Sequence, residues 1–484
     1  MSTTSKDKEN WDKANSKEIT NRKNGDIEDN VRDEMILSKA LNEWEERGYI
    51  IRKAIPVSVA YLLQTSIQLI SVLSLGHLGS VELAASTLAT MLMGSYLQGA
   101  KAAGFKSFQV TFSAVIYGSA TALDTLCSQA YTSGNLKMVG VYLQRAIIIN
   151  LLGFIPIAFI WWEAELILTL IGQSPEISAK TALFLKYLLI GAPAFLLFEN
   201  LKRYLQAQGI MKASTYVLII CCIIDICINF TLVWYKPLSL GFIGAPISTS
   251  ITYWLMFFLL AIYTKFINGY QAWGGWSRAA FHGWKHILSY MIPGILMVCS
   301  EWWAFELISL LSGYLGQLSL ASQGIIITSI NFLYQLSFGV STAASNRIGN
   351  LLGAGLVERA KMASKLSMQF AIIVALFNAT ILIVFKDYWG LIKCTSYVLP
   401  LAGIFEISDG LNSIGYGILR GQGRQNIGAF LNTPGYFILG LPIGIFTAFK
   451  LGYGLNEECK KRMKEGKEKF DSMISDDPYC DDDI

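Results

Sequence analysis

The sequence predicts an all-α polytopic membrane protein with two pseudo-symmetric helical lobes, and three observations lead to this fold class. Of the 484 residues, 53% are hydrophobic and only 15% are charged, whereas soluble globular chains carry about 25% charged residues. The charges gather near the two ends of the chain, and between them long apolar runs alternate with short polar links. Finally, short sequence patterns recur in the same order in the two halves.

The apolar runs have the length of membrane spans, since a span takes about 20 mostly apolar residues. Eleven runs qualify, near residues 54–75, 110–126, 140–162, 183–205, 214–235, 242–263, 287–312, 320–343, 363–385, 397–419 and 427–449. The apolar segment from Val81 to Gly99 precedes the second run, and either of the two could form the second membrane span. Lys and Arg are more frequent in the links on the side of the N-terminus, which predicts a cytosolic N-terminus.

The repeated patterns suggest two homologous halves. GSATALDTLCSQAYTSG (118–134) and GVSTAASNRIGNLLGAG (339–355) share four identities at a constant offset of 221. In many transporters built from repeats, the substrate site lies between the halves. The predicted units are a disordered cytosolic tail over 1–53, an N-lobe over 54–264, a linker over 265–286, a C-lobe over 287–449 and a charged tail over 450–484.

Several classes of function find no support in the sequence. The net charge of +4 averages two unlike regions and indicates no nucleic-acid partner. The eight cysteines lack disulfide or metal-ligand spacing. A phosphate-binding GxxxxGK[ST] motif and an HExxH motif are missing as well. We therefore expect that the protein is not an enzyme and has no resident cofactor. We expect its energy source to be a gradient of protons or, alternatively, of Na⁺.

Carboxylates inside the apolar runs are the sharpest functional signal, because a charge at the bilayer centre costs at least ~2.5 kcal/mol. Glu301 and Glu306 lie in CSEWWAFE, and Glu406 and Asp409 lie in IFEISDG. On a helix, Glu406 and Asp409 are about 60° apart and share a face, whereas Glu301 and Glu306 are about 140° apart and cannot line one narrow stripe. A buried carboxylate that binds either a proton or an organic cation would suit exchange transport; the alternative is that these acids only bond helices together.

Other polar and aromatic residues join this set. Gln64 and Asn331 could hydrogen-bond a neighbouring helix or a substrate, and bonding between helices is the simpler role for Gln68. Trp302 offers a ring face to a cationic solute, whereas its neighbour Trp303 could equally face lipid.

The acids of the first half suggest structural roles. Asp225 stands one turn from Asn229, and the two are expected to form a polar network between helices. Asp124, near a predicted cytosolic end, is expected to be a loop or cap residue.

The chain resembles the multidrug and toxic compound extrusion (MATE) transporters, and within them the fungal branch of the eukaryotic members. The similarity runs from about Ile55 to Gly454. Its carrying segments are LGHLGSVELAAS (75–86), TALDTLCSQAY (121–131), FENLKRYLQAQGIMKASTYVL (198–218), LGFIGAPISTSITYWLMF (240–257), CSEWWAFE (299–306), SNRIGNLLGAG (345–355) and LRGQGRQNIGAFLN (419–432).

The resemblance implies twelve helices in two lobes of six, alternating access, and export of organic cations or other xenobiotics against protons. In eukaryotic members the functional acids lie in the EWW segment and eleven residues before the Arg of the LRG-type turn, which match Glu301 and Asp409 here. Glu306 matches a second family acid, and Asn229 occupies the place of a bacterial N-lobe acid. The resemblance implies that the chain lies in a lipid bilayer, either the plasma or the vacuolar membrane. It also implies a small, cationic organic substrate and a monomeric chain.

The sequence also departs from the family. An extra stretch interrupts the second helix at about Leu92 to Gln109, and the expected twelfth helix is missing after Gly454. Two alternatives therefore remain open beside the exporter: a flippase for lipids or lipid-linked precursors from the same superfamily, and a truncated, inactive transporter.

Overall fold

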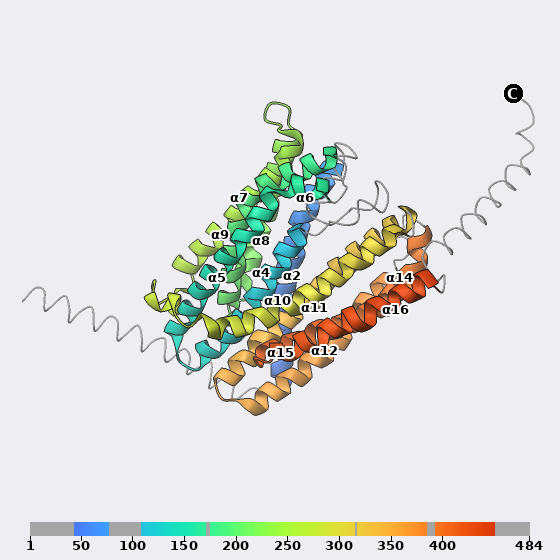
Figure 1. Cartoon of the computed structure of the whole chain (residues 1–484). Helices are drawn as coiled ribbons and strands as arrows, with labels where there is room; N and C mark the ends of the chain where they lie inside the picture. Colours follow the sequence, from blue (N-terminus) through green and yellow to red (C-terminus); the bar gives the residue numbers. More distant parts are fainter. Residues whose placement is uncertain (1–42, 77–107, 171–174, 315–316, 385–392, 451–484) are drawn as a thin grey trace, which may run out of the picture.

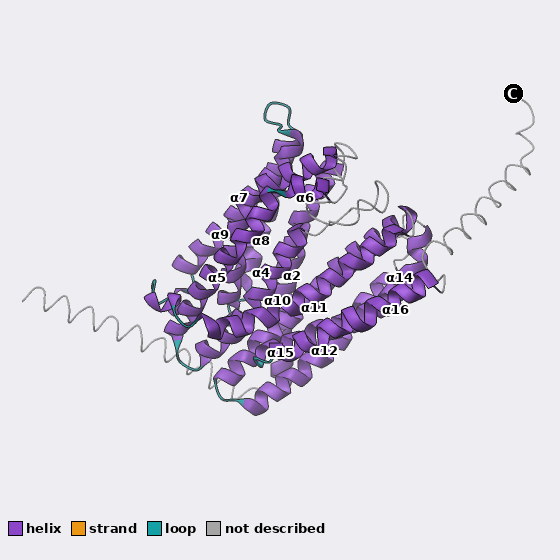
Figure 2. Ribbon diagram, in the orientation of Figure 1, coloured by secondary structure: helices purple, strands orange, loops and turns teal. Residues whose placement is uncertain are grey.

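The structure is a computed structural model that describes residues 43–76, 108–170, 175–314, 317–384 and 393–450. The competing segment from Val81 to Gly99, most of the stretch from Leu92 to Gln109 and the parts of the two predicted tails over 1–42 and 451–484 lie outside the described residues. Helices and short connections make up the described part, as Figure 2 shows. This confirms the predicted all-α class.

The N-lobe is the blue to green half of Figure 1. Its helices are α2 (Glu43–Gly76), α4 (Phe108–Thr132), α5 (Leu136–Trp162), α6 (Ala164–Leu170), α7 (Pro175–Ala207), α8 (Lys212–Val233) and α9 (Gly244–Phe266). Three short 3-10 turns, η2 (Gly241–Ile243), η3 (Tyr270–Ala272) and η4 (Arg278–Phe281), lie before α9 and in the linker. One continuous hydrophobic core joins these helices.

The C-lobe is the yellow to red half of Figure 1. Its helices are α10 (Trp284–Tyr314), α11 (Gln317–Gly353), α12 (Val357–Val384), α14 (Lys393–Gly421) and α15 (Gln425–Pro434), which continues through the π-helical turn η5 (Gly435–Gly440), α16 (Leu441–Ile445) and the π-helical turn η6 (Phe446–Lys450). Each of the eleven predicted apolar runs falls on helix in this order. Eight helices of the described part meet the length and apolarity of a membrane span, and α4, α11 and α14 also exceed the ~20 residues that a span needs.

The two lobes touch mainly through four helices. α2 packs against α11, and α4 packs against α10. The crossing of α4 and α10 requires glycine, because a Cβ at Gly118 would lie 2.5 Å from the Ile295 Cα and one at Gly294 would collide with Thr121. The lobes meet at one end and diverge toward the other, as Figure 1 shows.

Hydrogen bonds between the lobes concentrate where they meet, which we call the closed end; it contains the connections after α4, α7, α11 and α14. The Thr132 hydroxyl donates to the Asn350 carbonyl at 2.7 Å, and the Thr125 hydroxyl donates to the Arg420 carbonyl at 2.5 Å. This end was predicted to face the cytosol. The conformation is therefore closed at the predicted cytosolic side.

The predicted boundary of the N-terminal tail was wrong. Residues 43–53 form the first turns of α2 rather than a disordered segment. The reason is a contact that is remote in sequence: Arg347 of α11 donates to both carboxylate oxygens of Glu46, from Nε at 2.6 Å and from Nη2 at 2.8 Å. Glu46 is 3% exposed, so the ion pair fixes the start of α2 to the other lobe.

Glu46→Gln should lower the stability of the folded chain, because it removes the carboxylate that accepts two hydrogen bonds from the buried Arg347 guanidinium. Removing one partner of a buried pair costs about 3 to 5 kcal/mol. The midpoint of thermal unfolding in detergent, followed by size-exclusion chromatography, measures the effect. Glu43→Gln is the matched control, because Glu43 is exposed and its pair with Arg47 is a surface pair, worth about 0 to 1 kcal/mol. Equal midpoints for the two variants would contradict a stabilising role for the Glu46 pair.

Candidate functional site

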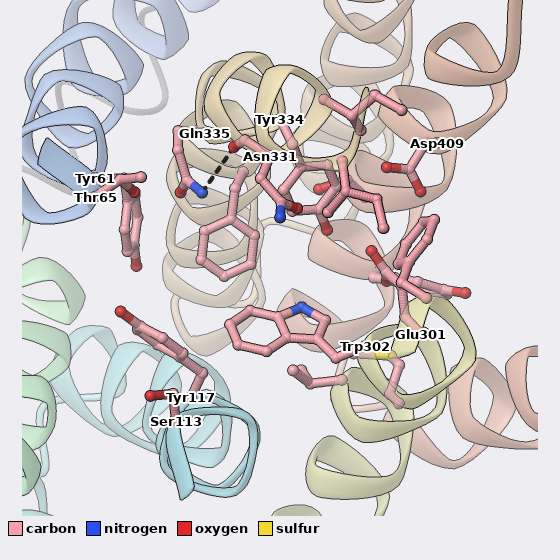
Figure 3. Close-up of a pocket in the computed structure, with 18 of the residues that line it drawn as sticks. Tyr61, Thr65, Ser113, Tyr117, Glu301, Trp302, Asn331, Tyr334, Gln335 and Asp409 are labelled. Carbon is pink, nitrogen blue, oxygen red and sulfur yellow. Dashed lines mark hydrogen bonds between the residues drawn. The ribbon is translucent and has the colours of Figure 1, made fainter. Parts of the chain in front are cut away.

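A cavity of about 150 Å³ lies between the lobes, lined by residues of α2, α4, α10, α11 and α14. Figure 3 shows side chains from both lobes around it. The N-lobe contributes Tyr61, Thr65, Gln68, Ser113 and Tyr117. The C-lobe contributes the acidic residues of the site and all of its other lining residues. This agrees with the expectation that the site lies between the two repeats.

Two of the predicted carboxylates line the same part of this cavity. Glu301 comes from α10 and Asp409 from α14, and Figure 3 shows both side chains in the same part of the site. They are 5% and 4% exposed. The Asp409 Oδ1 atom has no hydrogen-bond partner among the described residues. The pair is therefore buried but retains acceptor capacity for a bound group.

Three further predicted residues line the same cavity: Trp302, Glu306 and Asn331. We expected that Glu301 and Glu306 could not share one narrow stripe of α10. Both nevertheless line the site, because the cavity extends around a wide sector of that helix rather than along a stripe. Trp302 lies 5.8 Å from Tyr117, centroid to centroid, so an aromatic pair bridges the lobes. Trp303 is 40% exposed and is not among the lining residues, as its lipid-facing alternative expected.

Glu406 was predicted among the binding residues, and the structure places it outside the cavity. Its Oε1 atom accepts a hydrogen bond of 3.0 Å from Asn378 of α12. The side chain is fully buried between α12 and α14. Glu406 and Asp409 are about 60° apart around the helix axis, as expected. This angle is large enough that one carboxylate points to the cavity and the other to a neighbouring helix.

Gln64 was also predicted as a binding residue and takes the alternative role instead. Its amide nitrogen donates to Glu199 at 2.8 Å, and its amide oxygen accepts from the Lys202 ammonium at 3.1 Å. Glu199 and Lys202 themselves form an ion pair of 2.7 Å, fully buried in the N-lobe. Gln64 therefore joins α2 to α7, whereas Gln68, one turn further, lines the cavity.

The expectation that Asp124 is a loop or cap residue was wrong. Asp124 lies inside α4, fully buried, and its Oδ2 atom accepts from Arg203 of α7 at 2.9 Å. The same Arg203 nitrogen reaches Thr342 of α11 at 3.3 Å. Asp124 thus holds an arginine that bridges the lobes beside the cavity. No local pattern reveals this, because its partner is 79 positions away.

The structural role expected for Asp225 is confirmed. Its Oδ1 atom accepts hydrogen bonds from Thr252 at 2.7 Å and from Ser248 at 3.2 Å, both on α9. Asn229, one turn along, donates to Ser71 of α2 at 3.2 Å. These bonds tie α8 to its neighbours away from the cavity.

Sequence reasoning missed several residues that line the cavity, among them Tyr61 and Arg420. Tyr61 lines the cavity and covers the Lys202 ammonium, which lies 4.3 Å from the centre of its ring. Arg420 also lines the cavity and is 1% exposed. The available signal was its spacing from Asp409, because eleven residues are close to three full helical turns.

Asp124→Asn should destabilise the closed end, because it removes the carboxylate that faces the buried Arg203. The expected cost is about 3 to 5 kcal/mol, seen as a lower thermal midpoint of the detergent-purified chain. Glu176→Gln serves as the control, since Glu176 pairs with Lys180 at an exposed site. An unchanged midpoint for Asp124→Asn would contradict a stabilising role for the ion pair between Asp124 and Arg203.

The sequence of the chain is similar to those of known proteins. The family model MatE matches residues 99–231 and 293–446. An uncharacterised transporter of Schizosaccharomyces pombe is 39% identical over 420 residues, which span 85% of this chain and 75% of that protein. Multidrug and toxin extrusion protein 1 of Homo sapiens is 34% identical over 408 residues, covering 82% of this chain and 69% of that protein.

Solved structures agree with these sequence matches. The crystal structure of the eukaryotic MATE transporter AtDTX14 superposes with a TM-score of 0.76 at 28% identity, over 85% of this chain and 90% of that one. A point mutant of the MATE transporter VcmN of Vibrio cholerae shares the fold at 16% identity, with a TM-score of 0.74 over 86% of this chain and 92% of that one.

Proposed function

The chain belongs to the MatE family of membrane transporters, and from this premise we propose that it exports small organic cations in exchange for protons. The family membership and the multi-pass membrane architecture are established by the matches above. The direction of transport, the coupling ion and the charge of the substrate are our proposal. One observation carries it: Glu301 and Asp409 line one cavity between the lobes, and Asp409 has an oxygen without a hydrogen-bond partner among the described residues.

The chemistry of the site supports a cation. Glu301, Glu306 and Asp409 bring three carboxyls to one cavity, whereas Arg420 is the one Lys or Arg among its lining residues. Two carboxylates close together in a poorly solvated space do not ionise independently, because like charges repel and desolvation disfavours the charged form. A cationic solute or a proton can relieve this repulsion. Both therefore compete for the same carboxylates.

This competition provides the coupling for exchange. When the carboxylates bind protons, they lose affinity for an organic cation, and when they release protons, they regain it. If each transition between inward-open and outward-open states requires neutralised carboxylates, protons entering on one side drive cations out on the other. The aromatic rings of Trp302 and Tyr117 add attraction for a cation, about 0.5 to 2 kcal/mol for each contact.

The lobes also have the arrangement that alternating access needs. They are joined at the closed end by the Glu46 pair and by hydrogen bonds of single side chains, such as those of Thr125 and Thr132. Such contacts can be exchanged for others without unfolding either lobe. We infer that the inward-open state forms when these contacts break.

Neutralising the cavity carboxylates should abolish the response of efflux to pH. We expect Glu301→Gln and Asp409→Asn to lose proton-driven efflux of a fluorescent cation from vesicles with an imposed pH gradient, because an amide keeps the shape but cannot bind and release a proton. Glu406→Gln is the matched control, since Glu406 is equally buried on the same helix as Asp409 but bonds to Asn378. It should retain most of the response.

Two results would contradict this assignment. Normal pH-dependent efflux by a well-expressed Glu301→Gln variant would remove Glu301 from coupling. Equal losses in the Asp409 and Glu406 variants would mean that these two acids titrate as one coupled unit.

Trp302→Ala should weaken cation binding by roughly 2- to 30-fold, the factor that corresponds to one lost cation–π contact. Equilibrium binding of tetraphenylphosphonium to the detergent-purified chain measures it. Trp303→Ala is the matched control, because Trp303 is the neighbouring residue, carries the same ring and lies outside the cavity. If both variants bind equally well, Trp302 has no part in recognition.

A further inference from the structure

The interlobe linker, residues 267–283, lies at a membrane boundary. It follows the end of α9 at Phe266 and leads into the start of α10 at Trp284, and the helices on both sides of it are long and apolar enough to span a membrane. Its first part is bound at the closed end, because the Tyr204 hydroxyl near the end of α7 donates to the Gly269 carbonyl at 2.7 Å. The linker therefore runs along one surface of the bilayer, on the side that was predicted to face the cytosol.

Buried side chains of α5 hold the linker in a defined path. The fully buried Gln144 donates to the Gly275 carbonyl at 2.7 Å and accepts from the Ser277 N–H at 3.0 Å. Arg145, which is also buried, donates to the Ala279 carbonyl from Nε at 3.2 Å and from Nη2 at 3.0 Å. The linker is thus a shaped part of the N-lobe surface.

This shape presents large apolar side chains outward. Both 3-10 turns of the linker bury an alanine, Ala272 in η3 and Ala280 in η4. The large apolar residues of the linker that are more than half exposed are Ile267, Tyr270, Trp276 and Phe281. Aromatic residues are enriched at the headgroup level of a bilayer, where one part of the ring is apolar and another is wet. The linker therefore has the side chains of a surface that rests on lipid.

Basic side chains accompany these apolar ones. Three exposed basic residues lie in the linker or directly beside it, namely Lys265, Arg278 and Lys285. Arg278 and Phe281 are three residues apart in the 3-10 turn η4, and this spacing places two side chains on the same side of such a turn. From residue 200 to residue 300, Asp225 is the only acidic residue in the sequence, and it is buried in α8. No acid within this stretch of the chain offsets the positive charge at the linker.

We propose that the interlobe linker is a docking surface for anionic phospholipids of the cytosolic leaflet. Lys265, Arg278 and Lys285 bind the lipid phosphates and headgroup carboxylates, while Trp276 and Phe281 lie at the boundary between headgroups and acyl chains. The charges are complementary, because the cytosolic leaflet carries anionic headgroups that attract Lys and Arg at the membrane surface. Lipid docking here is independent of the cation–proton exchange proposed above.

The apolar side chains favour a lipid over a soluble phosphate compound. A soluble anion would pair with the basic residues but would leave Trp276 and Phe281 exposed to water. A phospholipid pairs with the same residues and also covers the rings, which removes apolar surface from water. One partner therefore satisfies both kinds of side chain on this surface.

Two lipids with the same acyl chains test this docking surface. Dioleoyl phosphatidylserine is anionic and dioleoyl phosphatidylcholine has no net charge, and native mass spectrometry of the full chain in detergent gives a dissociation constant for each. We expect the wild type to bind phosphatidylserine at least tenfold more tightly. The double variant Arg278→Gln/Lys285→Gln should weaken phosphatidylserine binding by roughly 10- to 30-fold, given about fivefold for each basic residue near an anionic surface. Its affinity for phosphatidylcholine should change little.

The matched control removes the same charge elsewhere. Lys361 and Lys365 are exposed residues of α12, which begins at the closed end but belongs to the other lobe. Lys361→Gln/Lys365→Gln should keep the preference for phosphatidylserine. All four substituted side chains are exposed, so the thermal midpoints of both double variants should equal that of the wild type.

A third double variant separates lipid from soluble anion. Trp276→Ser/Phe281→Ser should weaken the binding of both lipids severalfold and keep the preference between them, because the rings contact any phospholipid. Soluble glycerophosphoserine in excess should fail to displace phosphatidylserine from the wild type. Full displacement, or unchanged lipid affinities in this variant, would show a site for a free headgroup and overturn lipid docking.

Three other results also overturn it. The first is equal affinity of the wild type for the two lipids. The second is a preference for phosphatidylserine that survives in Arg278→Gln/Lys285→Gln. The third is an equal loss of the preference in Lys361→Gln/Lys365→Gln, which would reduce the effect to the net charge of the chain.

Discussion

Charged groups buried within a membrane need partners, and this constraint organises the whole structure. A charge removed from water is stable only when an opposite charge and hydrogen bonds replace its hydration. Glu199 is held by Lys202 and Gln64, Asp124 by Arg203, and Glu46 by Arg347. Each of these groups joins two helices. The polar residues of this chain thus decide which apolar helices become neighbours.

The same constraint distinguishes the site from the scaffold. Glu406 and Asp409 lie in one helix, three residues apart, and both are buried. Each keeps one carboxylate oxygen without a hydrogen-bond partner among the described residues, but Glu406 is bonded to Asn378 of a neighbouring helix, whereas Asp409 lines the cavity. A buried group whose partner is missing from the protein is suited to a partner that arrives with the substrate. Arg420 and Arg203 differ in the same way, because Arg420 lines the cavity and Arg203 is not among its lining residues.

The polar groups that lack a full set of protein partners line the cavity, and the cavity lies where the two lobes meet. Tyr61 and Tyr117 come from the N-lobe, and the acids come from the C-lobe. A ligand in this position touches both lobes, so its charge affects how they sit against each other. Binding and conformational change can therefore be coupled without any long-range pathway. The free-energy cost of an unpaired charge in the cavity changes when a carboxylate is protonated and when a ligand binds. Protonation and ligand binding therefore both affect the surface where the lobes meet.

The sequence by itself determined the fold class, the order of the spans and the repeat, and it pointed to Glu301, Trp302, Asn331 and Asp409, which line the cavity, because apolar length and intramembrane polar groups are local properties that a single chain displays. It did not determine the roles of Gln64, Glu406 and Asp124, nor the start of α2. Those depended on partners such as Lys202, Asn378, Arg203 and Arg347, which lie 138, 28, 79 and 301 positions away. Helical periodicity gives the direction of a side chain around its own helix. Only the packing of the helices decides whether that direction leads to another helix or into a cavity.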